Sequence, residues 1–478
     1  MLAAEKAVIF PRELSVDIPH ELAPSELMER LSDARRRSDE LFNLVRAGSL
    51  YERPIPERHR IIFYVGHLEA FDWNLLNGSV FRLESGLNSL HPEFDRLFAF
   101  GIDPVGGGLP SDVPSDWPPL DAVRDYVNHV RNTLDENLAS TILEPNSQTR
   151  DGFPLRTLLN VAVEHRLMHV ETLAYMLHQL PLDAKVRQPN SLHLAGPPVV
   201  QRMMPVPAGK VTLGLARGNE EFGWDNEFEA HTVDVPAFEI DQYKVTNRQY
   251  LEFMAAGGYE TRAFWDDDDW NWKTAHGISH PLFWKREGSP SSNQKSSEKS
   301  SQVSSLDWLW QTMFDEVPLP LDWPVYVSQA EAEAYARWAG KSLPTEAQWQ
   351  RAAYGTVDEH TRPYPWGSEA PNAKLGNFDF HRWDPAPVNA FPEGQSAFGV
   401  YDLLGNGWEW TSTVFGPFPG FEPFPFYRGY SADFFDGKHF VMKGGSARTA
   451  ACMLRPTFRN WFQAHYQNVY AGFRCVRR

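Results

Sequence analysis

Cysteine is scarce in this sequence, since only Cys452 and Cys475 occur among 478 residues. Two thiols cannot form a framework of several disulfides or a cluster of thiolate metal ligands. Any bound metal ion is therefore expected to use histidine or carboxylate ligands.

Long apolar runs and an excess of positive charge are also missing. No stretch approaches the roughly 18 to 20 apolar residues that cross a bilayer, and the start, MLAAEKAVIFPREL, lacks the basic and then apolar order of a signal peptide. The formal net charge of -17 would repel nucleic acid and anionic membranes. We therefore expect a cytoplasmic protein whose partners are small molecules.

The length predicts two domains, because single hydrophobic cores rarely grow beyond roughly 250 to 300 residues. In the first part of the chain, apolar residues recur every three or four positions, which predicts a four-helix bundle. The helical segments are 24–45, 59–76, 120–138 and 155–180. Residues 181–200 lose this periodicity and gather Pro, Gly and Asn. We place a helical domain at 1–185 and a linker at 186–202.

The second domain, 203–478, has a different composition, with most of the tryptophans, short strand patterns and many Gly/Pro turns. One helix is clear at 327–340, with Ser at its start and Gly at its end. We predict a loop-rich α+β fold. The Ser-rich stretch 289–305 has almost no apolar residues and is expected to be a disordered insertion without chemistry.

Two histidines suggest a metal site in the fourth helical segment. His165 and His169 stand at i and i+4, which places both imidazoles on one face about one turn apart. Glu171 lies about 200° round the helix from His169 and is expected to have a supporting or structural role instead. A third ligand must come from another helix.

His67 is the best candidate for that third ligand. It shares a helix face with Phe63, Phe71 and Asn74, which we expect to point toward the bundle interior. Three histidines on one side of an ion leave about three coordination positions open. Spacing alone does not distinguish iron from zinc.

The motif HRLMHVE (165–171) resembles the HxxxHxE motif of the ergothioneine-pathway sulfoxide synthases, a family that includes the related selenoneine synthases. His67, in YVGHLEAFDWN, sits where the first histidine of that family stands. The family joins an all-α DinB-like four-helix domain to an α+β domain related to formylglycine-generating enzyme, with a C-type-lectin-like fold. The segments that resemble the second domain are 206–214, 245–254, 324–353, 364–367, 399–413, 443–450, 455–461 and 471–474.

The resemblance implies a mononuclear non-haem iron(II) oxygenase of ergothioneine or selenoneine biosynthesis. In the family, O2, hercynine and a thiol or selenosugar donor react to form a carbon–sulfur or carbon–selenium bond at the imidazole C2 of hercynine. The resemblance implies that His67, His165 and His169 bind Fe(2+).

A copper site like that of formylglycine-generating enzyme is not expected. Its two cysteines would stand about three and eight residues after the serine of the GGS motif. Thr449 and Leu454 occupy those positions, and Cys452 has no partner in the sequence. We therefore expect the second domain to complete an iron site in the first.

The resemblance also suggests residues that contact hercynine, whose quaternary ammonium suits an aromatic cage. Candidates are Trp461 beside Asn460, and Phe71 or Trp73 from the His67 segment.

Two further assignments come from the resemblance. Family members place a tyrosine of the second domain near the oxygen site as a proton donor, and here both Tyr427 and Tyr430 are candidates. A structural Ca(2+) near Asn406, Gly407 and Glu409 is also suggested, since these residues offer oxygen ligands.

The donor pocket departs from the best-known branch of the family. That branch has an Asp after the Asn-Trp pair and an Arg four residues further on, both in the pocket for γ-glutamylcysteine, whereas this chain has Phe462 and Tyr466. Such a donor would lose two charge-assisted contacts, each worth about 1.5–3 kcal/mol. We predict that γ-glutamylcysteine is not the donor. Free cysteine and a selenosugar, whose uncharged ring could pack on both aromatic residues, remain open.

Two other functions use the same features. A non-catalytic small-molecule-binding metalloprotein would need the histidines but no position for O2. A zinc-dependent thiol transferase would use the same three ligands without O2.

Overall fold

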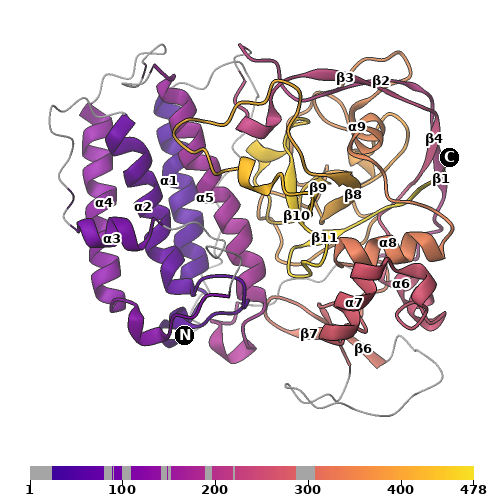
Figure 1. The fold of residues 1–478 in the computed structure, drawn as a ribbon, viewed down its shortest axis with the longest axis horizontal. Coiled ribbons are helices and arrows are strands. Elements are labelled where there is room, and N and C mark those ends of the chain that lie inside the picture. Colours follow the sequence, from indigo (N-terminus) through magenta and orange to yellow (C-terminus); the bar gives the residue numbers. More distant parts are fainter. Residues whose placement is uncertain are drawn as a thin grey trace, which may run out of the picture.

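The computed structural model describes residues 24–79, 89, 91–99, 109–140, 148, 152–188, 196–218, 221–286 and 307–477. A helical unit and a mixed unit of helices and strands lie side by side (Figure 1). The predicted insertion at 289–305 and part of the predicted linker lie outside the described residues.

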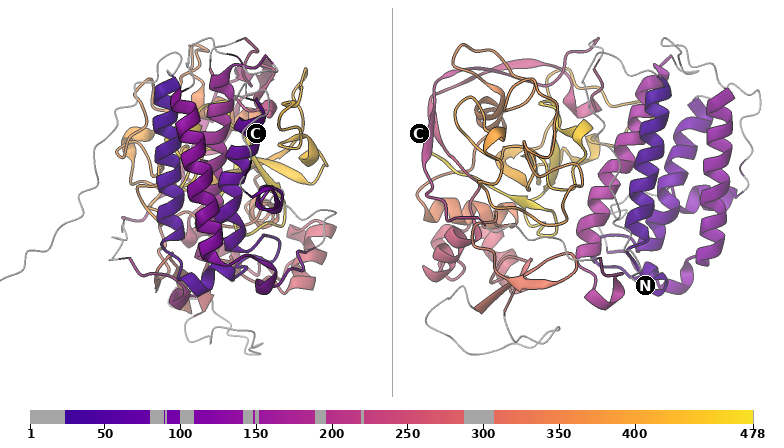
Figure 2. Two further views of the ribbon diagram at one scale, coloured as in Figure 1. Left: turned by 90° about the vertical axis from the view of Figure 1, so that its left-hand side faces the viewer. Right: turned by 180° about the vertical axis from the view of Figure 1, so that it is seen from behind.

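Four long helices build the first unit and run along one another (Figure 2). They are α1 (Pro24–Phe42), α2 (Ile61–Ser79), α4 (Leu120–Ser140) and α5 (Leu155–His178), joined by the short α3 (Pro92–Leu97). Helices α1 and α4 bury one apolar face, whereas α5 is buried on nearly all sides. The predicted helical bundle is confirmed.

Short strands and helices form the second unit, which confirms the predicted α+β class. The helices are α6 (Asn247–Ala255), α7 (Asp267–His276), α8 (Gln329–Trp338) and α9 (Glu346–Tyr354). The strands are β1 (Met203–Val206), β2 (Gly209–Leu213), β3 (His231–Val235), β4 (Phe238–Asp241), β5 (Trp284–Arg286), β6 (Trp308–Gln311), β7 (Glu316–Pro318), β8 (Trp408–Val414), β9 (His439–Lys443), β10 (Asn460–Gln463), β11 (Ala471–Gly472) and β12 (Val476–Arg477).

The described strands pair into small sheets with the orders β1-β4-β12, β10-β9-β8-β11, β2-β3 and β5-β6-β7. The sheet nearest the bundle is β10-β9-β8-β11, in which β11 pairs with β8 in parallel. Helix α8, expected from its sequence pattern, begins after Ser328, whose hydroxyl accepts a hydrogen bond from the Glu331 amide. Gly340 follows the helix in the left-handed conformation that glycine favours.

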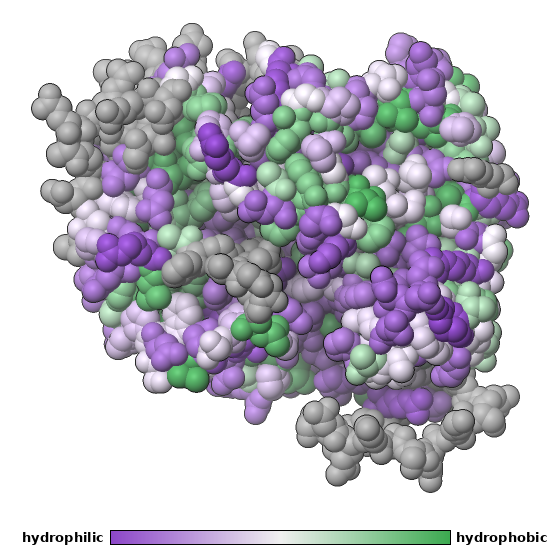
Figure 3. Space-filling model, in the orientation of Figure 1, coloured by the Kyte–Doolittle hydropathy of each residue, from purple (hydrophilic) through white to green (hydrophobic). Residues whose placement is uncertain are grey.

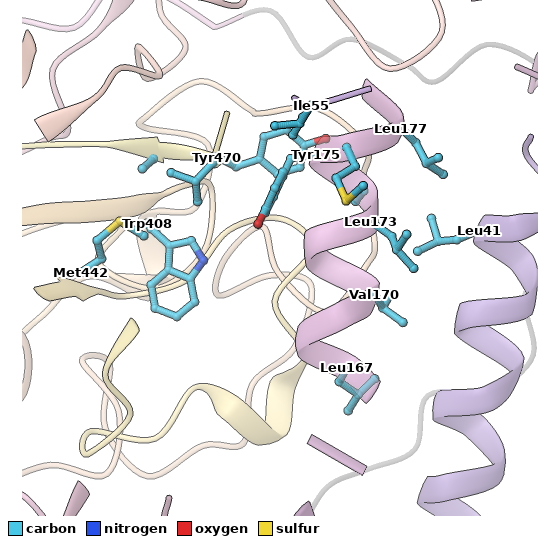
Figure 4. Packing of buried hydrophobic residues seen from close by; sticks show 14 of the residues in the cluster. Leu41, Ile55, Leu167, Val170, Leu173, Tyr175, Leu177, Trp408, Met442 and Tyr470 are labelled. Atoms are coloured by element: carbon cyan, nitrogen blue, oxygen red, sulfur yellow. The ribbon is translucent and has the colours of Figure 1, made fainter. Parts of the chain in front are cut away.

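Helix α5 is the bundle helix that packs against the second unit, so one hydrophobic cluster extends from the bundle into that unit. Val170 and Leu173 face Leu41 of α1, whereas Tyr175 faces Trp408 and Tyr470 (Figure 4). The two units therefore share one hydrophobic cluster, because α5 belongs to both packing layers. A second cluster lies wholly within the second unit.

A stripe along α5 makes most of the specific contacts between the units. Its members recur at the three- and four-residue spacing that keeps side chains on one helix face. They are Glu164, Met168, Glu171, Tyr175 and His178. We call these five residues the docking stripe.

Glu171 is the centre of the docking stripe. Its buried carboxylate accepts hydrogen bonds from Trp408 Nε1 at 2.7 Å, from Thr449 Oγ1 at 2.9 Å and from the Ser446 hydroxyl. Burial raises the pKa of Glu171. The residue therefore joins the two units, in agreement with its predicted direction away from the histidine face.

Glu164 lies at the N-terminal end of the docking stripe. Its oxygens accept hydrogen bonds from Arg455 Nη1 at 2.7 Å and Nη2 at 3.0 Å, and Trp224 Nε1 donates at 2.8 Å. Arg455 also pairs with the buried Glu227. A buried ion pair with satisfied hydrogen bonds favours one docked arrangement over others.

Polar and apolar residues are mixed on the face shown in Figure 3, and apolar residues gather in its upper middle. None of the described helices is long and apolar enough to cross a membrane.

We expect Glu171→Ala to lower the free energy of unfolding by about 3 kcal/mol or more. Three buried donors would lose their acceptor, at a cost of about 1–3 kcal/mol each. Chemical denaturation followed by tryptophan fluorescence measures this change. Glu136→Ala, on the exposed face of α4, is the control and should change stability by less than about 0.5 kcal/mol. Equal stability of the two variants would contradict the role of Glu171.

Candidate metal centre

Three histidines converge where α2 faces α5. His67, His165 and His169 are all buried, and one ring nitrogen from each lies within 4.8 Å of the others. Nε2 of His169 stands 3.2 Å from Nε2 of His165. Helical spacing explains the close approach of these two imidazoles, and the packing of α2 on α5 brings in His67.

The donor set fits a metal ion. Phe98 O can only accept, so His67 Nδ1 donates to it at 2.7 Å and Nε2 keeps its lone pair. Burial lowers the pKa of His67 to about 4 and the pKa values of His165 and His169 well below their usual range. All three imidazoles are therefore neutral, the form that binds metals. Two nitrogens about 2.1 Å from an ion and at right angles stand about 3 Å apart, close to the separation of His165 and His169.

Aromatic rings hold the imidazoles in place. Phe63 stacks on His67 with ring centroids 4.8 Å apart, and Phe71 stacks on His165 at 3.4 Å. The expected inward direction of Phe63 and Phe71 is thus supported. Asn74 was expected on the same face, but it is exposed and its amide lies 3.5 Å from a backbone carbonyl of α3. Asn74 lies about one helical turn after Phe71, where its side chain is no longer covered by the bundle.

A buried arginine ties the two ligand-bearing helices together directly beside the histidines. Arg166, next to His165, donates to both oxygens of Glu69 at 2.9 Å and to Asp72 at 2.7 Å. It also donates to the carbonyl of Leu68, the residue after His67, at 3.0 Å. These bonds fix α2 against α5 at the level of the imidazoles.

The same network reaches the other two long helices. Glu69 also accepts from Arg131 of α4 at 2.7 and 2.9 Å, and Arg131 donates to Asp39 of α1 at 2.7 and 2.8 Å. Arg166 and Glu69 are about 1% exposed at their side chains. Four helices are therefore joined through one set of buried charges, which sequence periodicity did not reveal.

The segment between β8 and β9 forms one wall beside the histidines and carries both candidate tyrosines. The ring of Tyr427 lies 6.2 Å from that of His165 and 5.3 Å from that of Phe71. Tyr430 lies further back, where its hydroxyl donates to Met168 Sδ at 3.5 Å. The geometry therefore places Tyr427 nearer to a candidate metal ligand than Tyr430.

Trp461 extends this wall away from the histidines. Its ring packs edge-on against Tyr430 at 5.4 Å, and Trp224 stacks on Tyr430 at 4.0 Å. Asn460 uses its side-chain oxygen to accept from the Trp461 amide at 2.8 Å. Trp73 is 3% exposed, and its contact with hercynine stays a prediction.

A second wall lies toward the C-terminal end of α5. Phe462 and Tyr466 stack on each other with centroids 4.9 Å apart, and Tyr175 packs edge-on against both rings. Arg58, from the turn before α2, donates through Nε to Tyr466 Oη at 3.2 Å. Sequence reasoning missed Arg58, because a single arginine in a loop has no periodic signal.

Positively charged side chains of the protein lie at the turn suggested for calcium. Glu409 accepts from Arg474 at 2.7 and 2.8 Å and lies 3.3 Å from Lys244 Nζ. Lys244, which is fully buried, also donates to the carbonyl of Gly405 at 3.1 Å.

The neighbouring groups at this turn are engaged as well. The Asn406 side chain hydrogen-bonds to both backbone groups of Ala386, and Gly407 packs closely on the Tyr326 ring. The side-chain oxygens of Asn406 and Glu409 therefore already have protein partners, and Ca(2+) at this turn stays a prediction.

Comparison with known families divides the chain in the same order as the structure. Residues 30–173 match the DinB superfamily. Residues 194–478 match the sulfatase-modifying factor enzyme 1-like domain.

Two relatives match nearly the whole chain. The chain is 33% identical over 470 residues to a hercynine oxygenase of Mycolicibacterium thermoresistibile, with 96% of each chain covered. It is 34% identical over 466 residues to the hercynine oxygenase of Mycolicibacterium smegmatis, covering 95% of this chain and 99% of that one. A formylglycine-generating enzyme of Thermomonospora curvata is 34% identical over 231 residues, which is 44% of this chain and 71% of that one.

We expect Arg166→Met to lower the free energy of unfolding by about 3–5 kcal/mol, because Glu69 and Asp72 would be left as buried charges without their shared partner. Uptake of a divalent metal should weaken together with stability, since α2 would no longer be fixed against α5. Denaturation and metal titration measure the two effects. Arg124→Met, on an exposed face of α4, is the matched control. Unchanged stability and metal uptake in Arg166→Met would show that the network does not position the histidines.

Proposed function

Because the chain belongs to the hercynine oxygenase family, we propose that it is a non-haem iron(II) oxygenase that bonds sulfur or selenium to the imidazole C2 of hercynine at the expense of O2. The observation that supports this proposal most is the convergence of three buried, neutral imidazoles in a chain that is similar to hercynine oxygenases over nearly its whole length.

His67, His165 and His169 are the proposed iron ligands. When bound, iron(II) would supply a redox-active ion with positions open for O2, the donor and the imidazole of hercynine. The role of the protein is then to bring the substrates together and to keep water away. Phe63 and Phe71 cover two of the imidazoles and restrict their rotation.

Hercynine is proposed to lie along the wall that contains Tyr427, Tyr430 and Trp461. The faces of aromatic rings attract quaternary ammonium groups, and each ring of this wall lies within 6.4 Å of a neighbouring ring, centroid to centroid. Phe71 links the wall to His165. A trimethylammonium group held at Trp461 and Tyr430 would leave the imidazole of hercynine free to extend toward the histidines.

Tyr427 is the proposed proton donor. Its ring is next to His165 and Phe71, whereas the hydroxyl of Tyr430 is already bonded to Met168. A phenol beside the reacting atoms can transfer a proton during the oxidation step.

The donor is proposed to be a small thiol or a selenosugar. Phe462 and Tyr466 present stacked rings and no carboxylate of their own, so the two charged contacts of a γ-glutamylcysteine pocket are absent at these positions. Both residues are half-buried.

Each of His67→Ala, His165→Ala and His169→Ala should lose bound iron and abolish turnover, because two imidazoles hold the ion too weakly. Iron content measured on the purified protein, with oxygen uptake in the presence of hercynine and a thiol, tests this. His360→Ala, a highly exposed position, should behave as the parent. A variant of the triad with full iron content and normal rate would remove that residue from the ligand set.

Tyr427→Phe is the matched variant in the same assay, since it keeps all three imidazoles. It should retain iron while losing rate, and Tyr430→Phe should lose less. Product formation by the zinc-loaded protein without O2 would instead favour a zinc-dependent thiol transferase.

In a competition among cysteine, a selenosugar and γ-glutamylcysteine at limiting concentration, we expect γ-glutamylcysteine to be used least. Two lost charge-assisted contacts correspond to about a hundredfold weaker binding or more. Product masses after reaction with hercynine and O2 give the ranking. The double variant Phe462→Asp, Tyr466→Arg should gain γ-glutamylcysteine use. A parent that prefers γ-glutamylcysteine would contradict the assignment of the pocket.

A further inference from the structure

A guanidinium group from the helical domain reaches the aromatic pair of the second domain. Arg58 lies in the turn before α2, is 5% exposed and donates through Nε to Tyr466 Oη at 3.2 Å. Its Cζ atom lies 5.3 Å from the ring centroid of Tyr466 and 6.0 Å from that of Phe462. The positive charge is therefore held beside two stacked rings by both a hydrogen bond and a cation–π contact.

The same group is close to the candidate metal centre. The ring of His59, the residue after Arg58, lies 4.2 Å from that of Phe63, which stacks on His67. Tyr64, six residues after Arg58, packs 5.7 Å from the His169 ring. By contrast, the wall assigned to hercynine contacts His165 through Phe71 and Tyr427. Arg58 therefore lies on the side of His169, away from the hercynine wall.

The chemistry of this cluster restricts what can bind there. A guanidinium has five N–H donors, no acceptor and a permanent positive charge. It favours a partner rich in oxygen acceptors, such as a carboxylate or several hydroxyls, and it repels an ammonium group. The rings of Phe462 and Tyr466 add an apolar surface for the carbon atoms of the same partner. Tyr175 lies edge-on to both rings, and its buried hydroxyl lies beside Tyr466.

We propose that Arg58 is a donor-binding residue that contacts oxygen acceptors of the sulfur or selenium donor and holds the donor against Phe462 and Tyr466. This inference rests on the proposed function and adds to it a specificity-determining residue from the opposite domain. The donor is thereby bound only when the helical domain and the second domain are docked. The end of the donor next to Arg58 has oxygen acceptors and no ammonium group.

Steady-state kinetics of the iron-loaded full-length protein test the proposal. In Arg58→Met the KM for the preferred donor should rise about tenfold or more, because a charge-assisted contact is lost. The KM for hercynine and the iron content should remain within about twofold of the parent. Cysteine, cysteamine and a thiosugar are compared, since cysteamine lacks the carboxylate of cysteine and the thiosugar offers hydroxyls only. A carboxylate contact predicts that the parent prefers cysteine to cysteamine and that Arg58→Met loses this preference. A hydroxyl contact predicts that the thiosugar shows the rise in KM.

Arg53→Met is the matched control, because Arg53 lies in the same loop and pairs with Asp112 instead of the aromatic residues. It should leave the donor KM unchanged. If Arg58→Met is unstable, Arg58→Lys keeps the charge without Nε, and Tyr466→Phe keeps the ring without the hydroxyl. Either should give a smaller, donor-specific rise in KM.

Two outcomes separate this inference from the proposed function. Equal changes in both KM values, or a fall in kcat alone, would overturn the role of Arg58 while the oxygenase assignment stands. Absence of product from the parent with every donor would overturn the oxygenase assignment. In that case, calorimetric titration of the zinc-loaded protein with each donor still tests the role of Arg58. If Arg58 binds the donor, the donor must bind more tightly to the parent than to Arg58→Met.

Discussion

A carboxylate buried between two domains must find hydrogen-bond donors, and Glu171 finds three of them in the second domain. Because donors and acceptor are all buried, α5 cannot slide or rotate without leaving several polar groups unsatisfied. His165 and His169 lie on the same helix, so their position relative to the walls from the second domain is fixed by this contact. Arg166 extends the constraint to α2 and thereby to His67.

The parts of the structure that depend on local periodicity could be predicted from the sequence. The four helices follow from apolar spacing, and the pairing of His165 with His169 follows from the helical repeat. The direction of Glu171 away from the imidazoles follows from the same geometry, but its partners do not, because they stand more than 200 residues later. Strand order was also inaccessible, since β11 pairs with β8 across a long stretch of chain.

Charged groups that lie far apart in the sequence were not accessible to sequence reasoning. The turn at Glu409 has the oxygen atoms that a calcium site needs, yet the positive charges come from Lys244 and Arg474, far away in the sequence. Arg58 was overlooked for the same reason, since its partner Tyr466 belongs to the other domain. A motif indicates which ligand atoms a site offers, whereas the fold determines which charged side chains lie beside those atoms.

Thr449 stands where formylglycine-generating enzyme would carry a cysteine, and here its hydroxyl binds Glu171 of α5. The position that would carry a metal ligand in formylglycine-generating enzyme instead contacts helix α5 in this chain. The two halves are consequently coupled, because a change at Glu171 leaves Ser446, Thr449 and Trp408 without their acceptor. Chimeras that exchange one half between relatives should therefore inherit activity only when these matched positions travel together.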